Sequence, residues 1–232
     1  MPNPPTDATT ATSGTGPAPD AFGAAVDAAG ADAAQAGDRV DVAAGRVADA
    51  PPALLDALRA IEESEALDPA VAGLGQVADA VVRPGAAEDV LTGKVIGHAA
   101  HPFLTDLPIG FWTSTSVLDL IGGRASRKAA DRLLALGLLS AVPTIATGLA
   151  EWRGAERRDQ RTGVVHAAAN SVGLALYGAS YVARKRGRRF RGVTLALAGM
   201  GAATVGGYLG GHLATARKVG TRDPTFARPP VG

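Results

Sequence analysis

The chain has 232 residues, with 22 acidic and 23 basic side chains and a formal net charge of +1. This balance hides two unlike parts, because residues 1–93 hold 15 acidic and 4 basic residues, whereas residues 94–232 hold 7 and 19. The lack of cysteine excludes disulfides, thiolate zinc sites, a covalently attached c-type haem and an iron–sulfur cluster held by this chain alone. Any metal would therefore be bound through nitrogen and oxygen.

Residues 1–50 consist mainly of Ala, Asp, Gly, Pro and Thr and contain almost no large apolar side chains. Such a segment cannot bury enough surface to offset chain entropy, so we predict a disordered acidic tail. The first 20 residues show neither a positively charged start nor an apolar stretch, so no cleavable secretory signal is predicted. A chain of this kind would be targeted to a membrane by its own first spanning helix.

Residues 51–93 show the apolar periodicity of short amphipathic helices. Two series at helical spacing lie between Pro51 and Pro84: Leu54, Leu55, Leu58 and Ile61, then Leu67, Val71, Leu74, Ala78 and Val81. We predict a helical arm over residues 51–93, with two helices that end at Pro84-Gly85. The arm either covers the rest of the protein or lies on the membrane surface. An arm that binds a partner is the alternative.

Residues 94–220 contain four apolar segments, each bounded by charged residues: 103–121, 133–149, 164–183 and 193–213. Each is close to the ~17–25 residues that a helix needs to span a bilayer. The first segment contains Asp106 and Asp119, which lie near its two ends, where a carboxylate is much less costly than at the bilayer centre. The connections are short, so neighbouring helices are predicted to run antiparallel.

These elements predict an all-α fold: an integral membrane four-helix bundle preceded by a disordered tail and short amphipathic helices, with a C-terminal tail at 221–232. We expect a multi-pass protein of the cell membrane, with a soluble helical bundle as the alternative. End A is the end of the bundle that holds the connection between the second and third helices, and end B holds the other two connections. Lys and Arg number nine at end A and ten at end B, so the positive-inside rule assigns no orientation.

The connection before the fourth segment, RKRGRRFR, combines six positive charges with one Phe. This pattern is typical of a headgroup anchor, and it predicts six residues in contact with membrane lipids: Arg184, Lys185, Arg186, Arg188, Arg189 and Arg191. A tight loop between spanning helices reads nucleic-acid grooves poorly, so no nucleic-acid partner is predicted.

The fourth segment contains glycines four residues apart, at Gly206 and Gly210 and at Gly207 and Gly211. This spacing favours close helix packing, with a face for a flat cofactor as the alternative. Close packing of this kind also allows a homo-oligomer.

Polar side chains inside a membrane are costly and are therefore candidates for function. An antiparallel bundle brings seven of them to end A: His98, His101, Asp106, Glu151, His166, Asn170 and His212. His98, His101 and His212 lie at helix ends, where a histidine also caps a helix or meets its dipole. His166 and Asn170 lie deeper and share one helix face.

Three functions remain open for this layer. In the first, two histidines ligate a haem b, with cofactor-binding residues drawn from one set: His98, His101, His166, Asn170 and His212. In the second, imidazoles and carboxylates hold a divalent metal such as Zn²⁺ or Fe²⁺: His101, Asp106, Glu151, His166 and His212. In the third, the layer locks the helices without a cofactor. No P-loop, nucleotide-binding fingerprint or hydrolase triad is present in the sequence, which disfavours a stand-alone enzyme.

Four stretches in order, GHAAHPFLTDLPIGFWTSTSVLDLIGG, ATGLAEW, ERRDQRTGVVHAAANSVGLALYGASY and GGYLGGHLA, resemble the four-helix membrane-protein family catalogued as domain of unknown function 2231. The likeness runs from about Leu67 to Gly220. It implies a His-Pro motif at His101-Pro102, an acidic-Trp pair at Glu151-Trp152, a His with an Asn one turn on, and a glycine-rich last helix. Many relatives have Pro after the first histidine, where this chain has Ala99.

Some members of that family carry a Rieske-type iron–sulfur domain, which points to redox work. This chain has no cysteine, so such a step would need a separate iron–sulfur or other redox partner. We therefore predict membrane electron transfer through a histidine-ligated haem b or metal, with a cofactor-free structural or partner-binding membrane protein as the alternative. The test is geometric: His101, His166 and His212 should lie in one layer that Glu151 also reaches.

Overall fold

The structure is a computed structural model that describes residue 35 and residues 52–226. The predicted N-terminal tail lies almost wholly outside the described residues, as does half of the predicted C-terminal tail. Every regular element of the described part is helical and none is a strand, which confirms the all-α prediction. The four long helices all belong to one compact unit that begins at Asp56.

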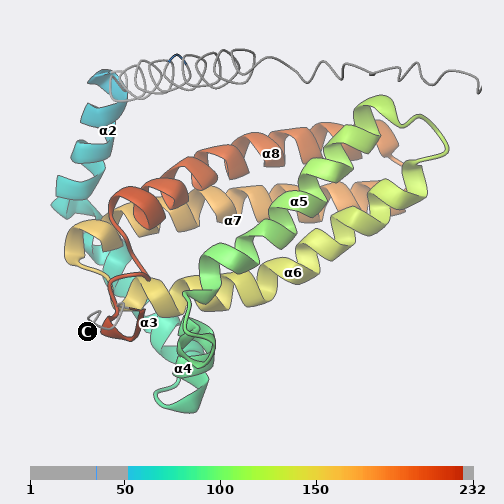
Figure 1. The fold of residues 1–232 in the computed structure, drawn as a ribbon. Helices are drawn as coiled ribbons and strands as arrows, with labels where there is room; N and C mark the ends of the chain where they lie inside the picture. Colours follow the sequence, from blue (N-terminus) through green and yellow to red (C-terminus); the bar gives the residue numbers. More distant parts are fainter. Residues whose placement is uncertain (1–34, 36–51, 227–232) are drawn as a thin grey trace, which may run out of the picture. The chain divides into compact units, whose positions relative to one another are not determined.

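Four antiparallel helices form the bundle: α5 (Ala100–Ile121), α6 (Arg127–Arg153), α7 (Arg157–Lys185) and α8 (Arg189–Gly211) (Figure 1). They contain the first three predicted apolar segments and all but the last two residues of the fourth. The shortest has 22 residues and is about 33 Å long at ~1.5 Å per residue, enough for a hydrocarbon core of about 30 Å. α8 continues into a π-helical turn, His212–Ala216.

The arm before the bundle contains the two predicted helices, α2 (Pro52–Glu63) and α3 (Asp68–Val81). It also contains a helix that the sequence did not predict, α4 (Ala86–Thr92). The two predicted helices do end before Pro84-Gly85. Gly85 adopts a φ of 97°, which only glycine adopts readily, and the chain then turns into a new helix. At seven residues, α4 is too short to show apolar periodicity.

α3 packs against α6 and α7, so this part of the arm covers end A of the bundle. Val71 and Ala78 of α3 are buried against Trp152 of α6. The indole N–H of Trp152 donates to the carbonyl of Gln160, 3.0 Å away, across the α6–α7 connection. The covering role predicted for the arm is therefore found for α3.

The middle of the bundle is packed around an aromatic pair. Trp112 of α5 stacks on Tyr177 of α7, with ring centroids 4.2 Å apart and an angle of 16° between the planes. Leu134 of α6 and Ala196 of α8 complete this core. Gly137 of α6 lies against the indole, because a Cβ there would come within 2.2 Å of the Trp112 Nε1.

The bundle has an apolar exterior and a partly polar interior. Large apolar side chains are exposed on all four helices, for example Ile121 at 81% and Leu139 at 68%, whereas Thr115 and Ser180 are completely buried. α6 and the continuous helix from Arg189 to Ala216 are long and apolar enough to cross a membrane, and only 39% and 28% of their apolar stretches are buried. The core helix of a soluble protein would be mostly buried. Spanning by α5 and α7 stays a prediction.

Candidate functional site

The structure brings two of the predicted histidines together inside the bundle near end A. His101, in the first turn of α5, and His166 of α7 have ring centroids 6.4 Å apart, and their planes meet at 85°. Both side chains are largely shielded from solvent. We call these two residues the imidazole pair.

A backbone carbonyl holds each ring of the imidazole pair. The Nδ1 of His101 lies 2.9 Å from the carbonyl oxygen of Thr144 on α6, and the Nδ1 of His166 lies 2.7 Å from that of Gly206 on α8. A carbonyl oxygen only accepts hydrogen bonds, so Nδ1 must be the protonated nitrogen of each ring. In a neutral imidazole the Nε2 lone pair is then left to accept a hydrogen bond or ligate a metal.

Glycines on the neighbouring helices make room for both rings. A Cβ at Gly148 of α6 would come within 2.8 Å of the His101 ring, and a Cβ at Gly210 of α8 would come within 2.8 Å of the His166 ring. Gly206 is equally restricted, because a Cβ there would meet the Asn170 amide at 2.5 Å. Gly206 and Gly210 therefore receive side chains of α7, whereas the space beside Gly207 and Gly211 is open.

Asn170 lies one turn beyond His166, as predicted from the sequence. Its amide nitrogen donates to the His166 carbonyl at 3.0 Å and lies 3.2 Å from the His166 Nε2. The Asn170 amide thus contacts the His166 ring at Nε2, whereas the Gly206 carbonyl contacts it at Nδ1. The pair and this amide form one polar group in which α5, α6, α7 and α8 all take part.

Glu151 reaches the same layer but acts on the backbone. Its Oε1 accepts a hydrogen bond of 2.9 Å from the backbone N–H of His101. The N-cap residue of α5, Ala99, has no side chain that could do this, so a carboxylate of α6 caps the start of α5 and also meets the positive end of its dipole.

The other predicted ligands have different partners. His212 pairs through Nε2 with a carboxylate oxygen of Glu62 on α2, 2.9 Å away. His98 and Asp106 are exposed. Within residues 52–226 there is no group of three or more histidines and carboxylates that could hold a metal ion. The five-residue metal set predicted from the sequence is therefore not assembled, because Glu151 caps α5, His212 is hydrogen-bonded to Glu62 and Asp106 is exposed.

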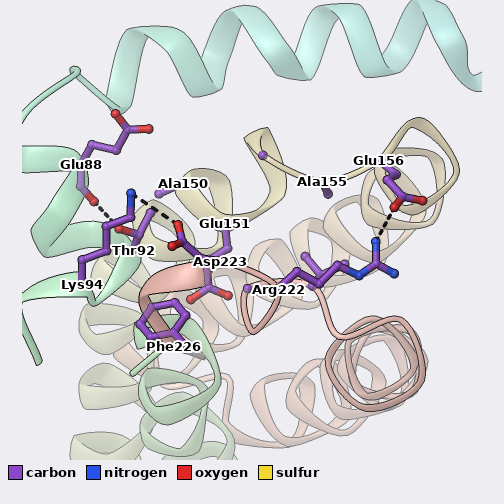
Figure 2. Close-up of a pocket in the computed structure, with 13 residues that line it drawn as sticks. Glu88, Thr92, Lys94, Ala150, Glu151, Ala155, Glu156, Arg222, Asp223 and Phe226 are labelled. Atoms are coloured by element: carbon purple, nitrogen blue, oxygen red, sulfur yellow. Dashed lines mark hydrogen bonds and ion pairs between the residues drawn. The ribbon is translucent and has the colours of Figure 1, made fainter. Parts of the chain in front are cut away.

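A cavity of about 310 Å³ opens at end A beside Glu151 (Figure 2). Its wall carries both signs of charge, and the Lys94 ammonium lies 3.4 Å from the Asp223 carboxylate. Hydrogen bonds from Thr225, followed by the charge of Lys94, lower the pKa of Asp223. Glu151 thus lies between this cavity and the imidazole pair.

An ion pair between α3 and α7 holds the arm against end A. The guanidinium of Arg161, at the start of α7, donates to both carboxylate oxygens of Asp68 on α3, at 2.8 and 3.0 Å. This hydrogen bonding lowers the pKa of Asp68. Arg161 also donates to the carbonyl of Glu62, 3.2 Å away. Neither Glu62 nor Asp68 was predicted to have a role, because side-chain partners this distant in sequence leave no local pattern.

At end B, each long helix contributes one charged residue to a partly buried network: Asp119 from α5, Asp131 from α6, Arg184 from α7 and Arg189 from α8. The Arg184 and Asp119 side chains are each only 1% exposed. We call these four residues the ion network. Arg184 and Arg189 were predicted to meet lipid headgroups, but their guanidinium groups face carboxylates, and Asp131 was not predicted to have a role.

Residues 97–223 match the model of a family described as "Predicted membrane protein (DUF2231)". The matched region covers more than half of the chain. The chain belongs to this family. The matched part of this DUF2231 protein includes the imidazole pair, Glu151 and the whole ion network. No curated protein and no solved structure matches the chain.

Proposed function

We propose that this DUF2231 protein is a multi-pass protein of the cell membrane that carries a haem b between His101 and His166 and transfers electrons. The observation that carries the proposal is the spacing of the imidazole pair, 6.4 Å between ring centroids. Two histidines that hold one metal ion would have ring centroids no more than about 6.4 Å apart, because a metal–nitrogen bond is about 2.1 Å and each ring centre lies roughly 1.1 Å beyond its nitrogen.

The hydrogen bonds of the pair support ligation. Histidines that bind metals almost always donate their other ring N–H to a carbonyl or carboxylate, which fixes the ring orientation and the tautomer. His101 and His166 both do so, through Thr144 and Gly206. A haem iron would need no protein ligand besides His101 and His166, whereas a tetrahedral zinc site would require further ligands.

The chain's own residues would have defined tasks at such a centre. His101 and His166 would hold the iron, the carbonyls of Thr144 and Gly206 would orient the rings, and Asn170 would release the His166 Nε2 by a rotation of its amide. A bound haem supplies one-electron chemistry. Because the chain contains no cysteine, the next electron carrier would be a separate iron–sulfur or other redox partner.

The membrane setting rests on three independent supports. The family is one of predicted membrane proteins, two helices are long and apolar enough to cross a bilayer, and large apolar side chains are exposed on all four long helices. Buried polar groups at membrane depth usually mark function, because they are costly in hydrocarbon.

The decisive measurement is the absorption spectrum and the haem and metal content of the detergent-purified protein. We expect a Soret band in the native chain, its loss in His101→Ala and in His166→Ala, and its retention in the matched controls His98→Ala and His212→Ala. A native protein that is folded but contains neither haem nor metal after expression with haem supplied would overturn the proposal.

One observation favours a second candidate, a cofactor-free membrane protein in which the pair locks the helices. Gly148 and Gly210 lie directly against the two rings, so the imidazoles fill space between helices that an apolar side chain could otherwise fill. In that case His166→Ala would lower thermal stability without changing any spectrum, and the native protein would be colourless.

A further inference from the structure

The two ends of the bundle use their basic side chains differently. At end A, five basic residues form ion pairs with carboxylates: Lys94, Arg153, Arg161, Arg217 and Arg222. At end B, the ion network uses Asp119 and Asp131, and these are the only acidic residues in the sequence from 119 to 132 and from 182 to 192. No acidic residue is left there to neutralise the exposed cations.

Eight basic residues at end B are exposed: Arg124, Arg127, Lys128, Arg132, Lys185, Arg186, Arg188 and Arg191. None of them lies within ion-pair distance of a carboxylate of residues 52–226. We call these eight residues the end-B cations. The described part of end A presents four exposed cations without such a partner: Arg83, Arg157, Arg158 and Lys218.

Apolar side chains project beside the end-B cations. Phe190, between Arg189 and Arg191, is 87% exposed, and Ile121, at the end of α5, is 81% exposed. Exposure of these side chains to water would be unfavourable. At a membrane boundary, an apolar side chain enters the acyl region while neighbouring cations contact the headgroups. The exposed cations and the exposed apolar side chains therefore both indicate that end B lies at the boundary between the headgroups and the acyl chains of a membrane.

We propose that the end-B cations bind the phosphate headgroups of anionic phospholipids. Exposed Lys and Arg residues next to a spanning helix are attracted to a negatively charged leaflet, and the attraction falls off within one Debye length of about 8 Å at physiological salt. The ion network favours phosphate binding at this surface, because Arg184 and Arg189 neutralise Asp119 and Asp131. Without these ion pairs, the two carboxylates would repel phosphate. The proposal does not depend on whether the imidazole pair binds a haem.

The test uses the full chain in a nonionic detergent, with fluorescent phosphatidylglycerol as the probe and fluorescent phosphatidylcholine as the neutral comparison. One variant combines Lys185→Gln, Arg186→Gln, Arg188→Gln and Arg191→Gln. The matched control changes the same number of charges at end A: Arg83→Gln, Arg157→Gln, Arg158→Gln and Lys218→Gln. All eight residues are exposed, and helicity and thermal unfolding are measured for each variant.

We expect the native protein to prefer phosphatidylglycerol and the preference to weaken with added salt. The end-B variant should bind it at least about tenfold more weakly, since each removed cation lowers the attraction, while the end-A control should change by less than about twofold. If the end-B variant misfolds, Arg124→Gln with Lys128→Gln should show an intermediate loss. Equal losses in the end-A and end-B variants, or equal binding of both lipids by the native chain, would refute the proposal.

Discussion

The guanidinium of Arg184 on α7 and the carboxylate of Asp119 on α5 face each other with both of their nitrogen–oxygen pairs in contact, and each side chain is 1% exposed. Removing one partner of a buried ion pair costs up to about 3–5 kcal/mol when the other charge is left unpaired, whereas removing both charges costs much less. Here Arg189 still contacts Asp119 and Asp131 still contacts Arg184, so each single loss is partly compensated. Arg184→Gln and Asp119→Asn should still each destabilise the bundle, and the double variant should be more stable than the sum of the two losses predicts.

Thermal or denaturant unfolding in detergent measures this coupling in a double-mutant cycle. The exposed pair Arg59 and Asp56, at 3.7 Å, is the matched control, because exposed pairs contribute only ~0–1 kcal/mol. Additive losses for Arg184 and Asp119 would contradict the prediction.

Gly137→Ala should destabilise the core, since the new Cβ would come within 2.2 Å of the Trp112 indole nitrogen. Overpacking of a well-packed core typically costs about 1–3 kcal/mol. Gly110→Ala on α5 is the control, because nothing lies within 4 Å of the added Cβ there, and an alanine in place of a helical glycine is favourable by roughly 0.5–1 kcal/mol. Melting temperatures should therefore fall in the first variant and stay equal or rise in the second.

Acid should release α3 from end A through Asp68. Hydrogen bonding to Arg161 lowers the pKa of Asp68 below its usual 3.8, so the folded state favours the carboxylate. The contribution to docking is then fully present above pH 3.8 and is lost as the pH falls through the lower pKa of the folded state. Amide hydrogen exchange in peptides of α3 should rise over that range. Asp68→Asn should show fast exchange at every pH, whereas Asp56→Asn should behave like the native chain.

End B should face the cytoplasm, because the cytoplasmic leaflet carries the anionic lipids that exposed Lys and Arg prefer. The natural absence of cysteine allows a direct test with single cysteines, Gly154→Cys at end A and Ala125→Cys at end B. In intact cells a membrane-impermeant maleimide should label only the first, and permeabilisation should expose the second. The reverse pattern would establish the opposite orientation.

The four long helices could be predicted because each apolar segment is bounded by charge, and their antiparallel order follows from short connections. The predicted antiparallel order was sufficient to place His101 and His166 at the same end of the bundle. His212 and Asp106 could not be placed in the same way, because the direction of a side chain depends on the rotation of its helix and on packing. His212 meets Glu62, 150 residues away, which no local pattern indicates.

The ion network was missed for a related reason. Asp119 and Arg184 were each interpreted as residues of the membrane surface, because each lies near the end of an apolar segment. Whether such a residue turns inward or outward depends on a partner from another helix, and here all four helices supply one. Opposite charges at the same predicted end of a bundle are the sequence signal that could have revealed this network.

The carboxylate of Glu151 that caps α5 has a consequence for the order of events during synthesis. The His101 N–H finds its acceptor 50 residues later in the chain, so the start of α5 is incomplete when that helix leaves the ribosome. Chains grow at about 5–20 residues per second, which leaves this N–H without its final partner for several seconds. The first helix of the bundle therefore reaches its native end only after the second has been made, and the two are expected to mature as a hairpin rather than one by one.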